Sequence, residues 1–391
     1  MEAKRKVLAI TGIRSEYDIL YPIIKVLSDD EGFELKLVVS GAHLSDWHGY
    51  TIKKIEDDGF EIADKIDSLF STNRKTQRIK GIGSLTTGLS QTVERENPDF
   101  LLVVGDREES IATALVGNYM DVLAVHIGGG DPVYGNADDP IRFAISKLAH
   151  IHCAFTKQYA DNLLSIGEEE FRVFFTGNPA LDNIRNTHYL QIEDICSYLH
   201  LDINENKYIV LIKHPLSSEK EDAYIQMKTT LVALEEFCKE ANIKAVGIYP
   251  NTDPGSFDIL NAIGEYEGSE YIRFYKNLPR EIFINLLRKS LALVGNSSMG
   301  MLEAPFYKLP VVNIGNRQKG RLNAGNVEFA EYNNEEIKEA LNRACFDVRY
   351  RDDVGGLENP YGDGRTSGRI KDILLSINRS DKKWYIKKRL C

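Results

Sequence analysis

Four aspartates in the first half of the chain have a type and spacing that suit proton transfer. Asp106 directly follows the apolar run FLLVVG, and Asp131 follows the run VLAVHI and three consecutive glycines. Asp138 and Asp139 come shortly afterwards. A carboxylate that follows a buried strand can face a ligand and act as a general acid or base. Carboxylates gathered in one cleft also raise one another's pKa by repulsion, so that one can be an acid while its neighbour is a base.

Helix capping is the structural alternative for two of these aspartates. Asp is a common N-cap residue, but the glutamates two and three positions after Asp106 can stabilise the first helical turn by themselves, which favours a functional Asp106. Asp139 precedes a proline that is typical of the first helical position, so capping can account for it entirely. Capping does not account for Asp131 or Asp138, so these two are the better candidates for proton transfer.

Anion binding requires basic groups to gather locally, because the formal net charge of the chain is −10. That charge argues against a general nucleic-acid binder. Arg14 lies in the first strand-to-helix turn, TGIRSE, where a helix N-terminus suits a phosphate or sugar oxygen. A solvated arginine is an equally weighted alternative. The turn lacks the GxGxxG pattern, so a dinucleotide is not favoured.

The second half of the chain carries polar groups after its strand-like runs. The string GNSSMG (295–300) opens a predicted helix whose amides and hydroxyls could hold a diphosphate, and GNRQKGR (315–321) supplies three cations in five residues. A solvated loop is the alternative for the second string. The residues expected to bind substrate or nucleotide are Asn251, Asp253, Asn296, Ser297, Ser298, Glu303, Arg317, Gln318 and Arg321, with His214 facing the same site.

Cysteine and histidine usage predicts neither a metal nor a disulfide framework. The five cysteines are scattered without a CxxC pair, which fits a reducing cytosol. His150 and His152 alternate in the strand-like AHIHCAF, so at least one of them is expected to be a core residue, and no third ligand stands at a spacing that would suit a metal. The first apolar run, VLAI, is too short for a signal peptide or a membrane span. We therefore predict a cytoplasmic protein without metal, cofactor or membrane association.

Alternating strands and helices must position these groups. Continuous apolar runs such as YIVLI (208–212) and VVNI (311–314) alternate with helical patterns such as Tyr17–Ser28 and Ala223–Ala241, which indicates parallel sheets covered on both faces. LLVVGDREES in the first half is echoed by LALVGNSSMG in the second. The fold class is therefore α/β, with two Rossmann-like doubly wound lobes and a site in the cleft between them. We assign residues 1–180 to the first lobe, 181–375 to the second, and 376–391 to a tail that forms a helix or frays.

Taken together, these strings resemble the UDP-N-acetylglucosamine 2-epimerase family over nearly the whole chain. They are GDRE, the HIxGG(D/E) loop, DDxIRxAIxKLAH, GNSS and GxRQxGR. The likeness is greatest to the hydrolysing branch, which feeds the synthesis of sialic-acid-type sugars. The resemblance implies the glycosyltransferase-B architecture, a UDP-sugar substrate and a homodimer or homotetramer.

The resemblance also implies a reaction. In that family the C2 proton is removed while UDP leaves C1, and water then adds to the 2-acetamidoglucal with inversion at C2, so that UDP-GlcNAc gives ManNAc and UDP. Inversion needs acid/base groups at both faces of C2, for which we expect Asp106 and Asp131, with Asp138 or Asp139 as a third member. The groups expected to stabilise the departing UDP are Arg14, His214, Arg321 and the helix end at Ser297 and Ser298. Glu303 would hold the ribose.

One position departs from the family pattern. Some relatives carry Glu where this chain has Gly128, so either Asp131 takes over that role or the substrate differs. A related branch acts on UDP-N,N′-diacetylbacillosamine, and the extra glycines could make room for its acetamido group at C4. Three other functions stay open: a non-hydrolysing epimerase that gives UDP-ManNAc, a two-lobed glycosyltransferase, and a nucleotide-sugar sensor without turnover.

Overall fold

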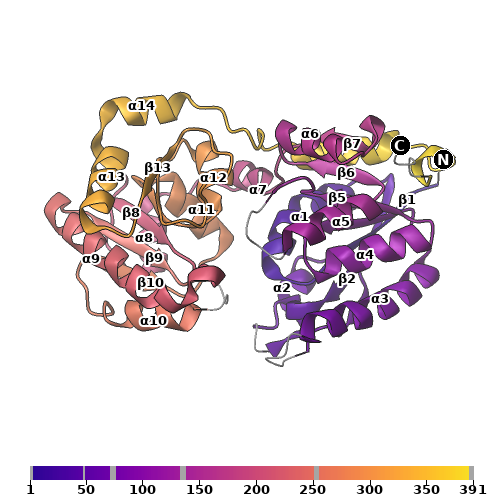
Figure 1. Cartoon of the computed structure of the whole chain (residues 1–391), viewed down its shortest axis with the longest axis horizontal. Coiled ribbons are helices and arrows are strands. Elements are labelled where there is room, and N and C mark those ends of the chain that lie inside the picture. The colour runs from indigo at the N-terminus through magenta and orange to yellow at the C-terminus, as the bar shows by residue number, and fades with distance from the viewer. Residues whose placement is uncertain (1–2, 47–48, 71–75, 133–137, 251–254, 387–391) are drawn as a thin grey trace. The chain divides into compact units, whose positions relative to one another are not determined.

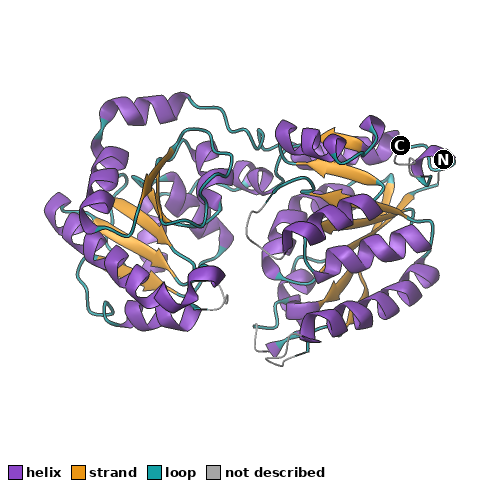
Figure 2. Cartoon of the chain, viewed as in Figure 1, coloured by secondary structure: helices purple, strands orange, loops and turns teal. Residues whose placement is uncertain are grey.

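A computed structural model of the chain describes residues 3–46, 49–70, 76–132, 138–250 and 255–386. The chain forms two compact units, one made of Met1–Arg185 with Tyr361–Cys391 and the other of Asn186–Pro360. Each unit contains a parallel sheet with helices packed on it (Figures 1 and 2). The prediction of two α/β lobes is therefore confirmed. In the described residues, no helix is both long enough and apolar enough to cross a membrane.

The first unit contains a seven-stranded parallel sheet in the order β3-β2-β1-β4-β5-β6-β7. Its strands are β1 (Arg5–Thr11), β2 (Phe33–Ser40), β3 (Ile62–Ile66), β4 (Phe100–Val104), β5 (Leu123–Ile127), β6 (Ile151–Ala154) and β7 (Val173–Phe175). Its helices are α1 (Arg14–Ser28), α2 (Ile52–Asp57), α3 (Thr76–Glu96), α4 (Glu108–Tyr119), α5 (Asp138–Leu148), α6 (Lys157–Ser165), α7 (Ala180–Asn186) and α15 (Thr366–Ser376). The strand order reverses between β1 and β4, which is where ligands bind in open sheets of this kind.

The second unit contains a six-stranded sheet in the order β10-β9-β8-β11-β12-β13, with its reversal between β8 and β11. The strands are β8 (Tyr208–Ile212), β9 (Lys244–Ile248), β10 (Ile272–Tyr275), β11 (Leu293–Gly295), β12 (Val311–Ile314) and β13 (Val327–Ala330). The helices are α8 (Ile192–Leu199), α9 (Ala223–Ala241), α10 (Ser256–Gly264), α11 (Arg280–Arg288), α12 (Met299–Leu302), α13 (Asn334–Phe346) and α14 (Val348–Gly356), with 3-10 turns η4 (Ser217–Asp222) and η5 (Ala304–Tyr307).

Strand β8 shows why these sheets are buried on both faces. Ile209 and Leu211 pack into one hydrophobic cluster with α9 and α13, while Tyr208, Val210 and Ile212 pack into another with α8 and α11. Successive side chains of a strand point to opposite faces, so an uninterrupted apolar run fills both clusters at once.

The chain returns to the first unit at Tyr361, which differs from the predicted second lobe over 181–375. The Asp182 carboxylate accepts hydrogen bonds from the backbone N–H groups of Thr366 and Ser367, both at 2.9 Å, and so holds the first turn of α15. Farther along, buried Arg172 donates to the carbonyl oxygens of Trp384 at 2.8 Å and Ile386 at 2.7 Å. The segment expected to be a separate tail is thus attached to the first unit.

Candidate functional site

Arg142 joins the two aspartates that the sequence put forward as acid/base groups. Its guanidinium donates to Asp106 Oδ2 and to the Gly128 carbonyl, the latter at 3.1 Å, and its Nη1 lies 3.6 Å from Asp131 Oδ2. Arg142 belongs to α5, whereas the aspartates follow β4 and β5. Asp131 is 3% exposed and the side chain of Asp106 is 20% exposed. Two carboxylates therefore share one cation at the ends of adjacent strands.

Asp106 does not cap the helix that follows it. The N-cap residue of α4 is Arg107, and its side chain makes no capping hydrogen bond. The Asp106 carboxylate is instead directed to Arg142. This excludes the capping alternative for Asp106 and leaves the carboxylate available for chemistry.

His126 connects the ends of the strands that carry these groups. Its ring is fully buried, with Nε2 2.8 Å from the Gly105 carbonyl and Nδ1 3.2 Å from Ser146 Oγ on α5. A carbonyl oxygen only accepts, so Nε2 donates and carries a proton. His126 thereby fixes Gly105, the residue before Asp106, against β5 and α5.

The three glycines are required by internal packing. A Cβ on Gly128 would lie 2.9 Å from the Phe155 ring, one on Gly129 2.9 Å from His126 Nδ1, and one on Gly130 would overlap the Tyr159 carbonyl. Gly128 and Gly130 also have φ of 83° and 79°, which favour glycine. The glycines thus let the backbone bend sharply between β5 and Asp131. A side chain at any of these three positions would therefore collide with protein atoms.

Two buried glutamates that the sequence analysis left out of the site lie beside Asp106. Glu16 is on the first turn of α1 and Glu109 on the first turn of α4. The Glu109 carboxyl occupies the space that a Cβ on Gly12 would fill; its Oε1 is 3.5 Å from Ser40 Oγ, and its Oε2 has no hydrogen-bond partner among the described residues. Burial raises the pKa of Glu16 well above its usual value, and the charge of Glu109 adds to this; burial likewise raises the pKa of Glu109.

These two glutamates have a raised carboxyl pKa at positions where the sequence did not lead us to expect one. The guanidinium of Arg142 contacts both Asp106 and Asp131, an arrangement that we did not predict. Both residues could have been found from the sequence, because they stand in motif strings: Arg142 in DDPIRF and Glu109 in GDREE.

The remaining predicted groups of the first unit are less constrained. Arg14 begins α1, and its half-exposed side chain lies 3.7 Å from Asp18 one turn later. Asp138 and Asp139 open α5, but their side chains lie outside the described part of the structure. Asn251 and Asp253, from the second unit, also lie outside the described residues.

In the second unit, Asn296 and His214 lie at the strand-order reversal between β8 and β11. The buried Asn296 amide accepts from the His214 N–H at 2.7 Å and donates to the His214 carbonyl at 2.8 Å. Both polar groups of the Asn296 side chain are therefore used to fix the backbone of His214. Burial lowers the pKa of His214 to about 3, and the positive charges of Arg317 and Lys213 contribute. His214 is thus a neutral imidazole near pH 7.

The loop 315–321 folds back on Asn296. Arg317 Nη1 and Gln318 Nε2 donate to the Asn296 carbonyl at 3.1 and 3.2 Å, and Arg321 Nη1 donates to Gln318 Oε1 at 3.3 Å. Gln318 is buried, while Arg321 is half-buried. The positive charge of Arg317 therefore acts on His214, while Lys319 of the same loop pairs with Glu331. The role of the loop as a basic patch that binds an anion stays a prediction.

The helix expected after Gly295 is short. Helix α12 has four residues, Met299–Leu302, and is followed by the 3-10 turn η5. Ser297 and Ser298 are half-buried before it, and the Ser298 side chain makes no capping hydrogen bond. Glu303 lies at the junction between α12 and η5. The roles of these three residues in nucleotide binding stay predictions.

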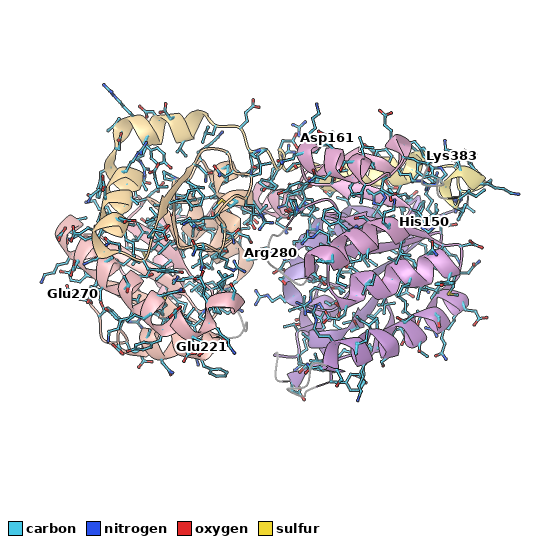
Figure 3. The ribbon with its side chains drawn as sticks, in the orientation of Figure 1. His150, Asp161, Glu221, Glu270, Arg280 and Lys383 are labelled. Atoms are coloured by element: carbon cyan, nitrogen blue, oxygen red, sulfur yellow. The ribbon has the colours of Figure 1, made fainter. Side chains whose placement is uncertain are left out.

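His150, just before β6, and His152, within it, are both buried, where the sequence predicted a core role for at least one. His150 (Figure 3) accepts at Nδ1 from the Ala124 N–H at 3.1 Å, and His152 Nε2 lies 3.1 Å from Glu168 Oε2. In the described residues, no group of three or more His, Cys, Asp or Glu side chains could hold a metal ion. Four cysteines are described, and they are free thiols.

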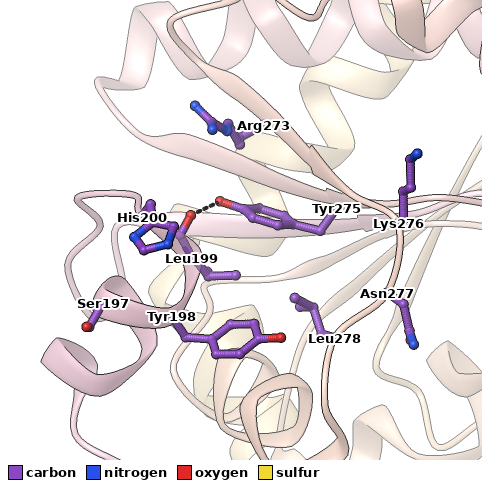
Figure 4. Close-up of a pocket in the computed structure, with 9 residues that line it drawn as sticks. All are labelled: Ser197, Tyr198, Leu199, His200, Arg273, Tyr275, Lys276, Asn277 and Leu278. Carbon is purple, nitrogen blue, oxygen red and sulfur yellow. Dashed lines mark hydrogen bonds between the residues drawn. The ribbon is translucent and has the colours of Figure 1, made fainter.

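A separate pocket of about 730 Å³ lies in the second unit beside α8 and β10 (Figure 4). Within it, the Tyr275 hydroxyl donates to the Leu199 carbonyl at 2.8 Å. None of the predicted site residues lines this pocket, whose nine lining residues are Ser197, Tyr198, Leu199, His200, Arg273, Tyr275, Lys276, Asn277 and Leu278.

The two parallel sheets define a two-lobed α/β protein of glycosyltransferase-B architecture. The chain matches the solved structure of UDP-GlcNAc 2-epimerase from Neisseria meningitidis bound to UDP-GlcNAc with a TM-score of 0.80, at 21% identity over 95% of this chain and 100% of that one. This likeness supports the fold.

Sequence comparison identifies the family. A family model described as UDP-N-acetylglucosamine 2-epimerase matches residues 25–375. UDP-N,N′-diacetylbacillosamine 2-epimerase (hydrolyzing) of Legionella pneumophila is 32% identical over 377 residues, which cover 95% of this chain and 96% of that protein. UDP-N-acetylglucosamine 2-epimerase of Neisseria meningitidis serogroup B is 31% identical over 342 residues, 87% of this chain and 88% of the relative. The chain belongs to the UDP-N-acetylglucosamine 2-epimerase family.

Proposed function

We propose that this chain is a hydrolysing 2-epimerase that converts UDP-GlcNAc to ManNAc and UDP. The observation that carries the proposal is the arrangement of Asp106 and Asp131 on the single guanidinium of Arg142, in a member of this epimerase family. Inversion at a carbon atom requires one group that removes a proton and another that returns one. Two carboxylates held at adjacent strand ends meet that requirement.

The reaction balances without an oxidant or a cofactor. A carboxylate takes the C2 proton, and the C1–O bond breaks with its electron pair leaving on UDP, which gives a 2-acetamidoglucal. Water then adds its hydroxyl to C1, while a proton is delivered to the opposite face of C2. Asp106 and Asp131 divide these proton transfers in our proposal, with Asp138 or Asp139 available as a third member.

Departure of UDP requires stabilisation of its developing negative charge. In the second unit, Arg317 and Arg321 supply positive charge, and His214 donates a hydrogen bond as a neutral imidazole. Arg14 supplies a further cation in the first unit. In this proposal Ser297 and Ser298 hold the diphosphate and Glu303 holds the ribose.

The test is incubation with UDP-GlcNAc in D₂O, followed by NMR of the products. We expect free UDP and ManNAc that carries deuterium at C2, without added metal or NAD. Asp106→Asn should abolish both products, while Asp161→Asn, at an exposed aspartate of the same unit, should leave them unchanged. Formation of UDP-ManNAc would instead identify a non-hydrolysing epimerase, and near-full activity of Asp106→Asn would show that the base is a different group.

A second substrate is favoured by one specific observation. The Legionella pneumophila relative is named for hydrolysing UDP-N,N′-diacetylbacillosamine. The same two carboxylates can perform the same steps on that sugar, because its C1 and C2 carry the same groups. The discriminating experiment offers both UDP-sugars in one reaction and compares kcat/KM from the two rates of product formation.

Three further properties remain part of the proposal. Supply of sialic-acid-type sugar synthesis, assembly as a homodimer or homotetramer and a cytoplasmic location are all expected from the hydrolysing branch and from cysteine usage. Light scattering of the purified chain tests the assembly, and the NMR product assay tests the sugar that the reaction supplies.

A further inference from the structure

Lys213 is a buried lysine in the unit that we propose to bind UDP. It follows β8 directly and is 2% exposed. Its Nζ lies 3.0 Å from the Tyr332 hydroxyl and 4.4 Å from the centre of the Tyr332 ring. Among the described residues, no carboxylate lies within ion-pair distance of it. A lysine buried in this way without an acidic partner is uncommon, since the loss of water strongly disfavours the ammonium form.

The Tyr332 hydroxyl suits Lys213 in both protonation states. Burial raises the pKa of Tyr332, so the phenol keeps its proton. A phenol can donate to a neutral amine through its O–H, and its oxygen can accept from an ammonium group. The contact at 3.0 Å therefore persists when Lys213 gains or loses a proton.

Two charges of opposite sign, on Glu219 and Arg317, act on Lys213. Glu219 of η4 is nearby, but its carboxylate accepts hydrogen bonds from the Gln226 amide at 2.8 Å and the Asn316 amide at 3.0 Å. Arg317 faces Lys213 from the loop after β12, and His214 follows it in the chain. Burial lowers the pKa of Lys213 to about 7, with Glu219 opposing this effect and Arg317 adding to it.

Lys213 is connected to the loop 315–321 through Tyr332. The Tyr332 hydroxyl occupies the space that a Cβ on Gly315 would fill, so the ring packs directly on the first residue of that loop. Gly315 has a φ of 83°, which lets the chain turn away from β12 at this contact. An anion bound by this loop would therefore lie near the buried amine of Lys213, whose pKa is close to 7.

We propose that Lys213 takes up a proton when a nucleoside diphosphate binds at the loop 315–321, and gives it back when the nucleotide leaves. This inference rests on the proposed function, because it assigns UDP to the second unit. The diphosphate brings negative charge into a site of low dielectric, where it stabilises the ammonium form of Lys213. Lys213 acts through this charge and through Tyr332 as a positioning residue.

Proton uptake on UDP binding is measurable by titration calorimetry at pH 8 in two buffers of different ionisation enthalpy. The terminal phosphate of UDP is fully ionised at that pH, because its last pKa is about 6. With a pKa of about 7, Lys213 is mostly neutral there before binding. We expect the wild-type chain to take up more than about half a proton per UDP, and Lys213→Met to take up much less. Because binding then takes up protons in the wild type, its affinity for UDP should fall from pH 7 to pH 9, whereas the affinity of Lys213→Met should not.

Lys220→Met, at an exposed lysine of η4, is the matched control and should take up as much as the wild type. Lys213→Arg keeps a permanent charge and should bind UDP with little proton uptake, which provides a second variant if Lys213→Met does not fold. Equal uptake by the wild type and Lys213→Arg would overturn the inference. Failure of the wild type to bind UDP at all would overturn both the inference and the proposed function, whereas binding without uptake overturns the inference alone.

Discussion

The Asn296 side chain pairs with the backbone of His214 as one peptide group pairs with another, through hydrogen bonds of 2.7 and 2.8 Å. Asn296→Asp would keep the acceptor but place a carboxylate oxygen against the His214 carbonyl. We expect a loss of about 1–3 kcal/mol in the free energy of unfolding, together with weaker UDP binding, because His214 loses its fixed position. Urea denaturation and calorimetry measure the two effects. Asn342→Asp, at an exposed position on α13, should change neither.

Removal of Arg142 should affect both stability and catalysis. Arg142→Met leaves Asp106 and Asp131 without their shared cation, and loss of one partner of a buried pair typically costs about 3–5 kcal/mol. We expect kcat to fall about 100-fold, because the two carboxylates lose their relative position. Stopped assays of UDP release measure the fall in kcat, and urea denaturation measures the loss in the free energy of unfolding. The control is Arg78→Met, which removes an arginine whose side chain is 55% exposed, in contrast to 10% for Arg142. A loss as large in that variant would contradict the assignment.

The carboxylate absent at position 128 cannot be restored by substitution alone. Gly128→Glu places a Cβ 2.9 Å from the Phe155 ring at a φ of 83°, and a side chain in that conformation costs about 1–3 kcal/mol. We expect a less stable protein with no gain in kcat. Gly83→Ala, inside α3 where a Cβ meets nothing within 4 Å, should instead stabilise the chain by about 0.5–1 kcal/mol. Thermal melting ranks the variants, and a more active Gly128→Glu enzyme would refute this explanation.

Neighbouring glutamates of α4 should respond to pH in opposite directions. The folded-state pKa of Glu109 is raised by burial, so Glu109 lowers the stability of the wild type as pH rises above about 4.5 towards that raised pKa. Glu109→Gln should therefore gain stability over the wild type at pH 8 and lose this advantage near pH 4. The pKa of Glu108 is lowered despite a burial effect that opposes it, chiefly by hydrogen bonding to Arg78. Its stabilisation is present above about pH 4.5 and is lost below, so Glu108→Gln should be less stable than the wild type at pH 8.

The unfolding free energies of these two variants between pH 4 and pH 8 test the signs. Shifts in the same direction would show that the two carboxyl groups share one environment. The comparison is informative because the residues are adjacent in sequence and both lie in the first turn of α4, so helix propensity and the helix dipole act on them alike.

The inner strands of both sheets could be predicted from the sequence, but the outer ones could not. The predicted runs at 208–212 and 311–314 coincide with β8 and β12, and the predicted helix Ala223–Ala241 coincides with α9. The strands that we did not predict include β3, β7, β10 and β13, which form the edges of the two sheets. An edge strand is only partly buried and needs fewer apolar residues, so its run is too weak to recognise.

Candidate site residues could be placed at strand ends from the sequence where a motif follows an inner strand. Asp106, Asp131 and His214 each stand directly after such a strand or its glycine turn. Arg142 and Glu109 were missed, because their importance comes from contacts with residues far away in sequence, Asp106 and Gly12. The return of the chain at Tyr361 was missed for the same reason, since the carboxylate that holds α15 is Asp182.

That return has a consequence for synthesis on the ribosome. The sheet of the first unit is translated first, yet the segment that Asp182 and Arg172 bind is made only after the whole second unit. While α15 is still inside the ribosome, Asp182 lacks the N–H groups of Thr366 and Ser367, and Arg172 lacks the carbonyl groups of Trp384 and Ile386. The surface of α1 that packs on α15 is also uncovered. The first unit to emerge is therefore the last to be completed, and a nascent chain stalled within the second unit leaves this surface of α1 exposed.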